Sequence, residues 1–213
     1  MIIDMHIHTK PASACSDLDP AELIEEAKRI GLDGVCITEH DKIWAPEAIR
    51  ELREKYDFLV LRGTEITSMD GDMLVFGLDR EFDKIISVKE LRGLVDEVDG
   101  VMIAAHPFRG AFLEGGEVSI PGVTLTVEEA CKKPFLKFMD TVESLNGENS
   151  ELEDEFTLKV CEGLNMKGTG GSDAHSAKEV GRAVTIFEMD INCEKDLIRE
   201  LKAGRFRAEI FRR

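Results

Sequence analysis

The chain opens with the stretch IIDMHIH (residues 2–8), in which apolar side chains alternate with acidic and imidazole side chains. Alternate residues of a β-strand share a face, so Asp4, His6 and His8 should point to one side while the apolar side chains enter a helix-covered layer. A buried face of this kind needs compensation. Metal binding by His6 and His8, with Asp4 orienting one ring, is favoured over a hydrogen-bonded core network.

Short apolar runs alternate with amphipathic stretches along the rest of the chain, which is typical of an α/β domain with a mostly parallel sheet. Further strands are expected at residues 34–38, 58–61, 73–76, 101–105, 141–145, 168–172 and 184–187. Helices are expected from Asp19 and Pro20 to Gly31, and around residues 49–56, 88–98, 152–164 and 197–201. Roughly seven βα units favour a barrel over an open, doubly wound sheet.

Composition and charge limit the classes of function. The 213 residues fit one domain, 1–213, and the formal net charge of −16 argues against extended contact with a nucleic-acid backbone. A small anionic substrate remains compatible, because bound metal ions reverse the local sign of charge. The basic C-terminal residues are expected to form a solvated chain end: Arg205, Arg207, Arg212 and Arg213.

The sequence predicts a cytoplasmic protein without membrane contact, since neither a secretory signal nor an apolar run of membrane-spanning length is found. Five widely spaced cysteines without a Cys-x-x-Cys pair suggest neither a disulfide framework nor a thiolate zinc site. Cys15 and Cys36 lie near histidines, but a small buried residue is favoured over a ligand there.

All five histidines lie in four short clusters, at residues 4–8, 38–41, 105–107 and 172–175. Each cluster ends or follows a predicted strand, where parallel barrels build their active sites. Asp173 and His175 repeat the alternation of the first strand near the other end of the chain. Imidazoles and carboxylates gathered in this way predict a site for divalent metals.

Other polar residues beside these clusters have two interpretations each. Asp17, in the loop after the first strand, and the neighbours of His40 are either site residues or solvated and capping groups. Four more follow later strands, where helix capping or turn formation explains them as well as a catalytic role does: Glu65, Asp72, Glu143 and Asn146.

His106 precedes a proline whose ring fixes the turn and the direction of the imidazole. Arg109 follows three residues later and could fork onto phosphate oxygens, or form a surface ion pair. The irregular residues 110–126 could cover the pocket.

Taken in order, these motifs resemble those of the PHP family, the polymerase and histidinol phosphatase phosphoesterases. Each motif is weak alone, whereas the ordered set is specific and spans residues 4–175. It consists of Asp-x-His-x-His at Asp4, His6 and His8, Ser-Asp at Ser16 and Asp17, Thr-Glu-His-Asp at Thr38 to Asp41, Gly-x-Glu at Gly63 to Glu65, His-Pro at His106 and Pro107, and Ser-Asp-Ala-His at Ser172 to His175.

The resemblance implies a TIM-like, distorted (β/α)7 barrel with two or three divalent metal ions (zinc, manganese or iron) that hydrolyses phosphate esters. It further implies three groups of ligands: His6, His8, Glu65 and Asp173 for one metal, Glu65, His106 and Asp72 for a second, and Asp17, His40 and His175 for a third. Many relatives carry a histidine where this chain carries Asp72.

The expected reaction is hydrolysis of a small phosphomonoester by a hydroxide held between metals, with Asp173, His175 and Arg109 acting at the phosphate. A nuclease or nucleotide phosphatase acting on short nucleic-acid ends would use the same ligands. An amidohydrolase-type barrel also begins with His-x-His, but the Thr-Glu-His-Asp cluster and the final Asp-x-His favour the phosphoesterase. A non-catalytic metal-binding domain is the remaining alternative.

Overall fold

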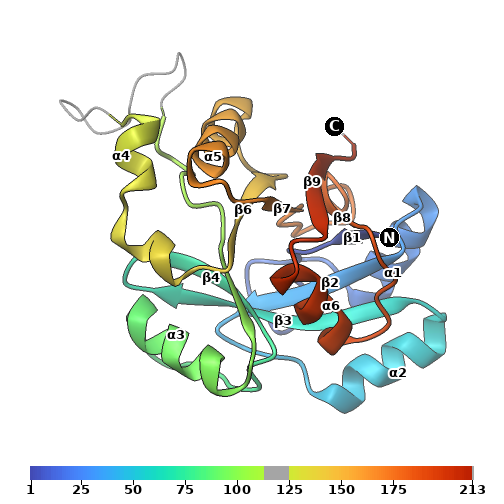
Figure 1. Ribbon diagram of the computed structural model, residues 1–213. Helices are drawn as coiled ribbons and strands as arrows, with labels where there is room; N and C mark the ends of the chain where they lie inside the picture. The colour runs from blue at the N-terminus through green and yellow to red at the C-terminus, as the bar shows by residue number, and fades with distance from the viewer. Residues whose placement is uncertain (113–124, 213) are drawn as a thin grey trace.

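A computed structural model describes residues 1–112 and 125–212, and its strands form one nine-stranded sheet (Figure 1). The order across the sheet is β7-β6-β5-β4-β3-β2-β1-β8-β9. The strands are β1 (Ile2–Asp4), β2 (Gly34–His40), β3 (Leu59–Ser68), β4 (Gly71–Phe76), β5 (Val101–Ala104), β6 (Thr141–Asn146), β7 (Gly168–Gly171), β8 (Ala183–Phe187) and β9 (Phe206–Ile210).

The two ends of this sheet approach each other and nearly close a barrel. The Thr185 hydroxyl of β8 donates to the Gly170 carbonyl of β7 at 2.9 Å, and the Gly170 amide donates back to that hydroxyl at 2.9 Å. The expected TIM-like, distorted barrel is therefore confirmed. The sheet is less parallel than predicted, because β4 and β8 run against the other strands.

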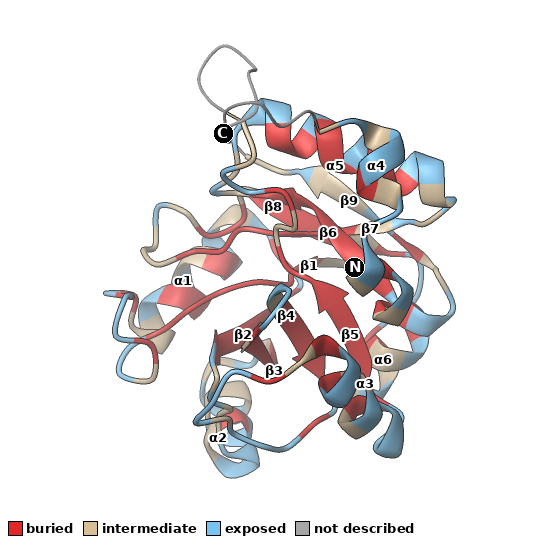
Figure 2. Cartoon of the chain, turned by 90° about the vertical axis from the view of Figure 1, so that its left-hand side faces the viewer, coloured by how far each residue is buried: buried red, intermediate tan, exposed pale blue. Residues whose placement is uncertain are grey.

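Helices cover the outside of the barrel and leave their polar faces in solvent (Figure 2). The first helix begins and ends at the residues that the sequence predicts. The Asp19 side chain caps its N-terminus, and Gly31 adopts the left-handed conformation at its C-terminus. The helices are α1 (Pro20–Ile30), α2 (Pro46–Tyr56), α3 (Val88–Glu97), α4 (Val127–Cys131), the 3-10 helix η1 (Pro134–Phe138), α5 (Glu151–Leu164) and α6 (Glu194–Lys202).

The opening stretch buries its apolar side chains, but in two different hydrophobic clusters. Ile3 and Met5 are fully buried in one hydrophobic cluster with Leu197 of α6, and Ile7 lies in another with Leu23 of α1. Burial of each such side chain stabilises the fold by about 1.5–3 kcal/mol. Met5 shares the Cys36 face of the sheet, whereas Ile7 lies on the opposite face with Val35. The expectation of one apolar and one polar face along residues 2–8 is therefore wrong, because the chain changes face after Met5, where regular pairing has ended.

Three predictions need correction or qualification. Regular pairing in the first strand stops at Asp4, and only an isolated bridge from Ile7 to Ala174 continues it. The basic C-terminal stretch is not a solvated end: it forms β9, in which Phe206 is buried. The prediction that residues 110–126 cover the pocket falls largely on residues 113–124, which lie outside the described residues.

None of the described helices combines the length and the apolar character that a membrane crossing requires.

Candidate metal centre

The strand ends bring the histidine clusters together at one edge of the barrel. Strands β1, β2, β3, β5, β6 and β7 run in the same direction, as their pairings require. Their carboxyl ends therefore share an edge, and the start of the reversed β4 lies there too. A Cβ on Gly171 would sit 2.5 Å from His6 Cβ and 2.7 Å from Glu143, so only glycine lets β7 approach this closely.

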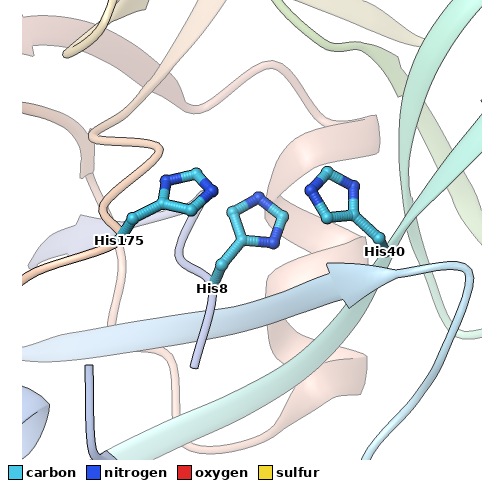
Figure 3. A group of neighbouring side chains, drawn as sticks. All are labelled: His8, His40 and His175. Atoms are coloured by element: carbon cyan, nitrogen blue, oxygen red, sulfur yellow. The ribbon is translucent and has the colours of Figure 1, made fainter. Parts of the chain in front are cut away.

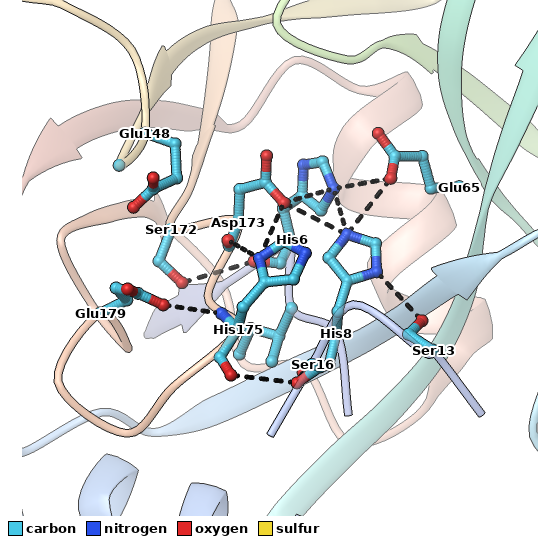
Figure 4. Close-up of polar contacts among 12 residues, drawn as sticks. His6, His8, Ser13, Ser16, Glu65, Glu148, Ser172, Asp173, His175 and Glu179 are labelled. Atoms are coloured by element: carbon cyan, nitrogen blue, oxygen red, sulfur yellow. Dashed lines mark hydrogen bonds and ion pairs between the residues drawn. The ribbon is translucent and has the colours of Figure 1, made fainter. Parts of the chain in front are cut away.

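Four buried side chains form the inner cluster, defined as His6, His8, Glu65 and Asp173 (Figure 4). The two Nε2 atoms lie 3.1 Å apart. Glu65 Oε2 is 3.4 and 3.2 Å from the Nε2 atoms of His6 and His8, and Asp173 Oδ1 is 3.5 and 3.2 Å from them. Zinc ligands about 2.0–2.2 Å from the metal stand about 3.3–3.6 Å apart in a tetrahedral site. The donor set and its spacing fit a divalent metal.

Both imidazoles of the inner cluster are oriented by contacts at Nδ1, the nitrogen that faces away from the cluster. His6 Nδ1 donates to Glu143 Oε1 at 3.0 Å, and His8 Nδ1 contacts the Ser13 hydroxyl at 3.4 Å, which itself donates to Glu39. A proton on Nδ1 leaves the lone pair on Nε2, which is the form that ligates metals. The prediction that Asp4 orients a ring is wrong, because its carboxylate accepts backbone amides, including those of Ser172 and Gly181.

Negative charge dominates the interior of the inner cluster. Burial alone would lower the pKa of His6, but Asp173, Glu143 and Glu65 raise that pKa well above its usual value. Burial alone would raise the pKa of Glu65, yet His6, His106 and His40 lower it well below its usual value. Among the described residues, the buried Oε2 of Glu65 makes no well-aligned hydrogen bond, although imidazole nitrogens of His8 and His40 lie 3.2 and 3.0 Å from it. A cation at the centre would satisfy that oxygen.

A second group shares Glu65 with the inner cluster. Glu65, Asp72 and His106 offer ligand atoms that lie within 4.8 Å of one another. Glu65 Oε1 is 2.9 Å from His106 Nε2, so its two oxygens face different groups. Asp72, at the start of β4, is thus close enough to act as the carboxylate counterpart of a histidine ligand.

A third group consists of His8, His40 and His175, whose rings gather from three strand ends (Figure 3). The His8 and His40 ring centroids are 4.2 Å apart, and those of His8 and His175 are 4.7 Å apart. Asp17 belongs to no such group among the described residues: its side chain is exposed, although its amide donates to the His175 carbonyl at 3.1 Å.

Arg109 lies at the rim of the inner cluster. Its Nη1 is 2.7 Å from Asp173 Oδ2, on the side of the carboxylate away from the His6 and His8 contacts. A cavity of about 360 Å³ adjoins it and is also lined by Asp72, His106 and Phe135. The surface ion pair that the sequence left open is therefore a contact at the site itself.

Two of the converging residues have strained backbones. His106 and Asp173 adopt positive φ values of 29° and 53°, which residues other than glycine rarely do. Such conformations cost of order 1–3 kcal/mol and are concentrated at functional sites.

Cys36 is buried in the core and Cys15 is exposed, and neither belongs to a candidate metal group among the described residues. The main contribution that the sequence understates is that of Glu143. A carboxylate within the otherwise uncharged stretch TVESLN was the available signal.

Comparison with known proteins places this geometry in context. The PHP domain family model matches residues 4–140, and a PHP-associated model matches residues 155–206. The uncharacterized protein MJ1587 of Methanocaldococcus jannaschii is 28% identical over 117 residues, which cover 51% of this chain and 68% of that protein.

Two solved structures share the fold. A candidate metal-dependent phosphoesterase from Bifidobacterium adolescentis aligns with a TM-score of 0.63 and 19% identity, covering 81% of this chain and 87% of its own. A two-domain protein from Bacteroides vulgatus, containing a predicted PHP-like metal-dependent phosphoesterase, aligns with a TM-score of 0.68 and 21% identity. That alignment covers 99% of this chain and 64% of the other.

Proposed function

The chain belongs to the PHP domain family, and from this premise we propose that it is a metal-dependent phosphoesterase that hydrolyses a small phosphomonoester. The observation that carries the proposal is the inner cluster, where two imidazole Nε2 atoms and two carboxylates converge within 3.5 Å beside the guanidinium of Arg109. Such a set combines ligands for a cation with a group that binds phosphate.

The three groups of ligands would hold two or three divalent ions of zinc, manganese or iron. The first and second groups share Glu65, and the first and third share His8. His6, His8, Glu65 and Asp173 would hold the first, and Glu65, Asp72 and His106 the second. His40 and His175, with His8, would hold a third. Divalent ions supply Lewis acidity, because they neutralise phosphate charge and lower the pKa of bound water.

The protein's own residues would orient the substrate and the ligands. Glu143 holds His6 by its Nδ1, and Asp173 presents one oxygen to the imidazoles and the other to Arg109. Arg109 would bind phosphate oxygens at the mouth of the cavity. His175, half-buried beside Asp173, has its Nδ1 fixed by the Asp173 carbonyl at 2.8 Å, so its Nε2 is the nitrogen available to the site.

Charge and size favour a small substrate. The cavity beside Arg109 has a volume of about 360 Å³, which suits a small ester better than a polymer. The net charge of −16 disfavours extended nucleic-acid contact. A nuclease or nucleotide phosphatase for short nucleic-acid ends is the second candidate, because it would use the same ligands.

The test is turnover of an aryl phosphate by the metal-loaded protein and by an Asp173→Ala variant. We expect that variant to lose both metal and activity. Asp190→Ala, at an exposed carboxylate, is the matched control and should behave as the unaltered protein. Full activity of Asp173→Ala with unchanged metal content would overturn the assignment.

Substrate class needs a separate measurement. Small sugar and amino-alcohol phosphates, nucleoside mono- and bisphosphates and short oligonucleotides should be compared by kcat/KM. A preference for the small monoesters supports the proposal, whereas a preference of at least about 10-fold, roughly 1.4 kcal/mol, for oligonucleotide ends favours the nuclease.

A further inference from the structure

Arg109 is held at each of its three nitrogens. Nη1 is 2.7 Å from Asp173 Oδ2, Nε donates to Asn149 Oδ1 at 3.1 Å, and Nη2 donates to Asn146 Oδ1. Contacts of exposed charged side chains add little to the stability of a protein. Because Arg109 is one third exposed, its three fixed partners suggest a role other than stability. The contacts therefore fix a direction as well as a position.

Chemistry fixes the orientation of both asparagine amides. Asn146 Nδ2 donates to Glu143 Oε2 at 2.9 Å, and Asn149 Nδ2 donates to Asp154 Oδ1 at 3.0 Å. Arginine only donates and ionised carboxylates only accept, so each amide between them must turn its oxygen to Arg109. Glu143 and Asp154 are both buried, which anchors the two amides to the interior.

The two asparagines also form one unit of the backbone. Asn146 is the last residue of β6, and Asn149 lies in the turn before α5. Asp154, in the first turn of α5, accepts the Asn146 amide at 3.2 Å as well as the Asn149 side chain. The start of α5 therefore holds both amides in register with the end of β6.

We propose that Asn146 and Asn149 are positioning residues that aim the guanidinium of Arg109 at the substrate phosphate. Arginine has five N–H donors, and the three contacts leave one N–H on each terminal nitrogen. Two such donors suit a bidentate phosphate contact. Asp173 is the single carboxylate among the three partners, and the two neutral amide oxygens add fixed contacts without cancelling more of the guanidinium's charge. This inference rests on the proposed function.

The test is a double-mutant cycle with inorganic phosphate as the probe. Asn149→Ala should raise the inhibition constant of phosphate about 5-fold in the unaltered background, because one charge-assisted hydrogen bond is lost. In the Arg109→Gln background the same change should have almost no effect. Equal effects in both backgrounds would overturn the proposal, since Asn149 would then act independently of Arg109.

A matched pair at Asp154 sharpens this test. Asp154→Asn keeps an acceptor oxygen for Asn149 and should retain phosphate affinity, whereas Asp154→Ala should mimic Asn149→Ala. Metal content and thermal stability, measured for every variant, identify any that fails to fold. If Asp154→Ala folds, keeps its metals and binds phosphate as the unaltered protein does, the proposal is wrong.

An independent readout separates this inference from the proposed function. The Nε–H signal of Arg109, identified by its absence in Arg109→Gln, should exchange slowly with solvent and should lose that protection in Asn149→Ala. This NMR measurement needs no substrate. An unprotected Nε–H overturns the positioning role, whereas a protected Nε–H in a protein that hydrolyses no phosphate ester leaves the contact intact and refutes the proposed function.

Discussion

Carboxylates outside the barrel and carboxylates inside it are paired with different partners. On the outside, Glu26 is held by Arg29 and Arg212 at 2.7 and 2.6 Å, and Glu200 by Arg199 and Arg205 at 2.9 and 2.6 Å. In the described part of the chain, no lysine or arginine forms an ion pair with Glu65, which contacts imidazoles.

Glu65 therefore differs from Glu26 and Glu200 in having no arginine or lysine partner among the described residues. The outer carboxylates have permanent cations, so their charges are matched within the chain. In the inner cluster, Asp173 has one permanent cation, Arg109, whereas Glu65 relies on imidazoles, which are neutral when they ligate metals. A buried carboxylate without a permanent partner is costly, and divalent ions would remove that cost.

The largest effect is expected from removing the charge of Glu65. Glu65→Gln should lower metal content and reduce kcat/KM by more than about 100-fold, because losing even an indirect partner of a metal ligand costs 10–100-fold. Elemental analysis and steady-state kinetics measure both effects. Glu188→Gln, at an exposed carboxylate, is the control. Retention of all metals by Glu65→Gln would break the comparison.

Removing the metals should destabilise the interior and leave the outer ion pairs unaffected. A ligand present at 100 to 1,000 times its Kd stabilises a protein by about 2.7–4.1 kcal/mol. Chelation should therefore lower Tm by about 5–15 °C, and added zinc or manganese should restore it. An unchanged Tm after complete, verified metal removal would contradict the account.

Asp72 should matter less than Glu65 because it serves only the second group. Asp72→Asn should reduce kcat/KM about 10-fold and leave the metal of the inner cluster in place. Asp83→Asn, at an exposed carboxylate in the loop after β4, is the control. Equal losses from the two variants would mean that Asp72 contributes surface charge alone.

The smallest effect is expected at an outer carboxylate. Hydrogen bonds from Arg29 lower the pKa of Glu26, and burial opposes this effect. Hydrogen bonds from Arg212 lower the pKa further, so that it falls from its usual value to about 2. A lowered folded-state pKa stabilises the protein above the unfolded-state value of 4.5, and this contribution is lost as the pH falls toward 2.

Glu26→Gln should therefore cost about 1 kcal/mol of unfolding free energy at pH 7. Urea unfolding at a series of pH values should show the cost unchanged down to about pH 5 and shrinking at lower pH. Metal content and activity should remain as in the unaltered protein. A loss of metal would show that outer and inner carboxylates are coupled.

The sequence predicts the barrel and most of the converging residues because periodicity and strand ends are local properties. The alternation in residues 2–8 predicts a buried strand that carries His6 to the site, but it does not predict the change of face between Met5 and Ile7. Long-range contacts are not local. The hydrogen bond between His6 and Glu143 joins positions 137 residues apart. The local sequence around Glu143 is equally compatible with a turn-forming residue and with a catalytic one.

Strand direction and pairing also depend on the whole sheet. Residues 59–76 form an antiparallel hairpin of β3 and β4. The apolar run at residues 73–76 does not by itself show whether that strand pairs in a parallel or an antiparallel direction. The strand β9 was missed because arginines interrupt its apolar pattern. Arg207 within the strand pairs with Glu209. The flanking Arg205 and Arg212 pair with Glu200 and Glu26, which lie on separate helices.

The central claim is that the inner cluster binds a divalent metal. The most direct measurement is anomalous X-ray diffraction from crystals of the metal-loaded protein at the absorption edges of zinc, manganese and iron. The account predicts a peak about 2.0–2.3 Å from His6 Nε2, His8 Nε2, Glu65 and Asp173. A loaded, active protein with no metal within reach of these four side chains would contradict it.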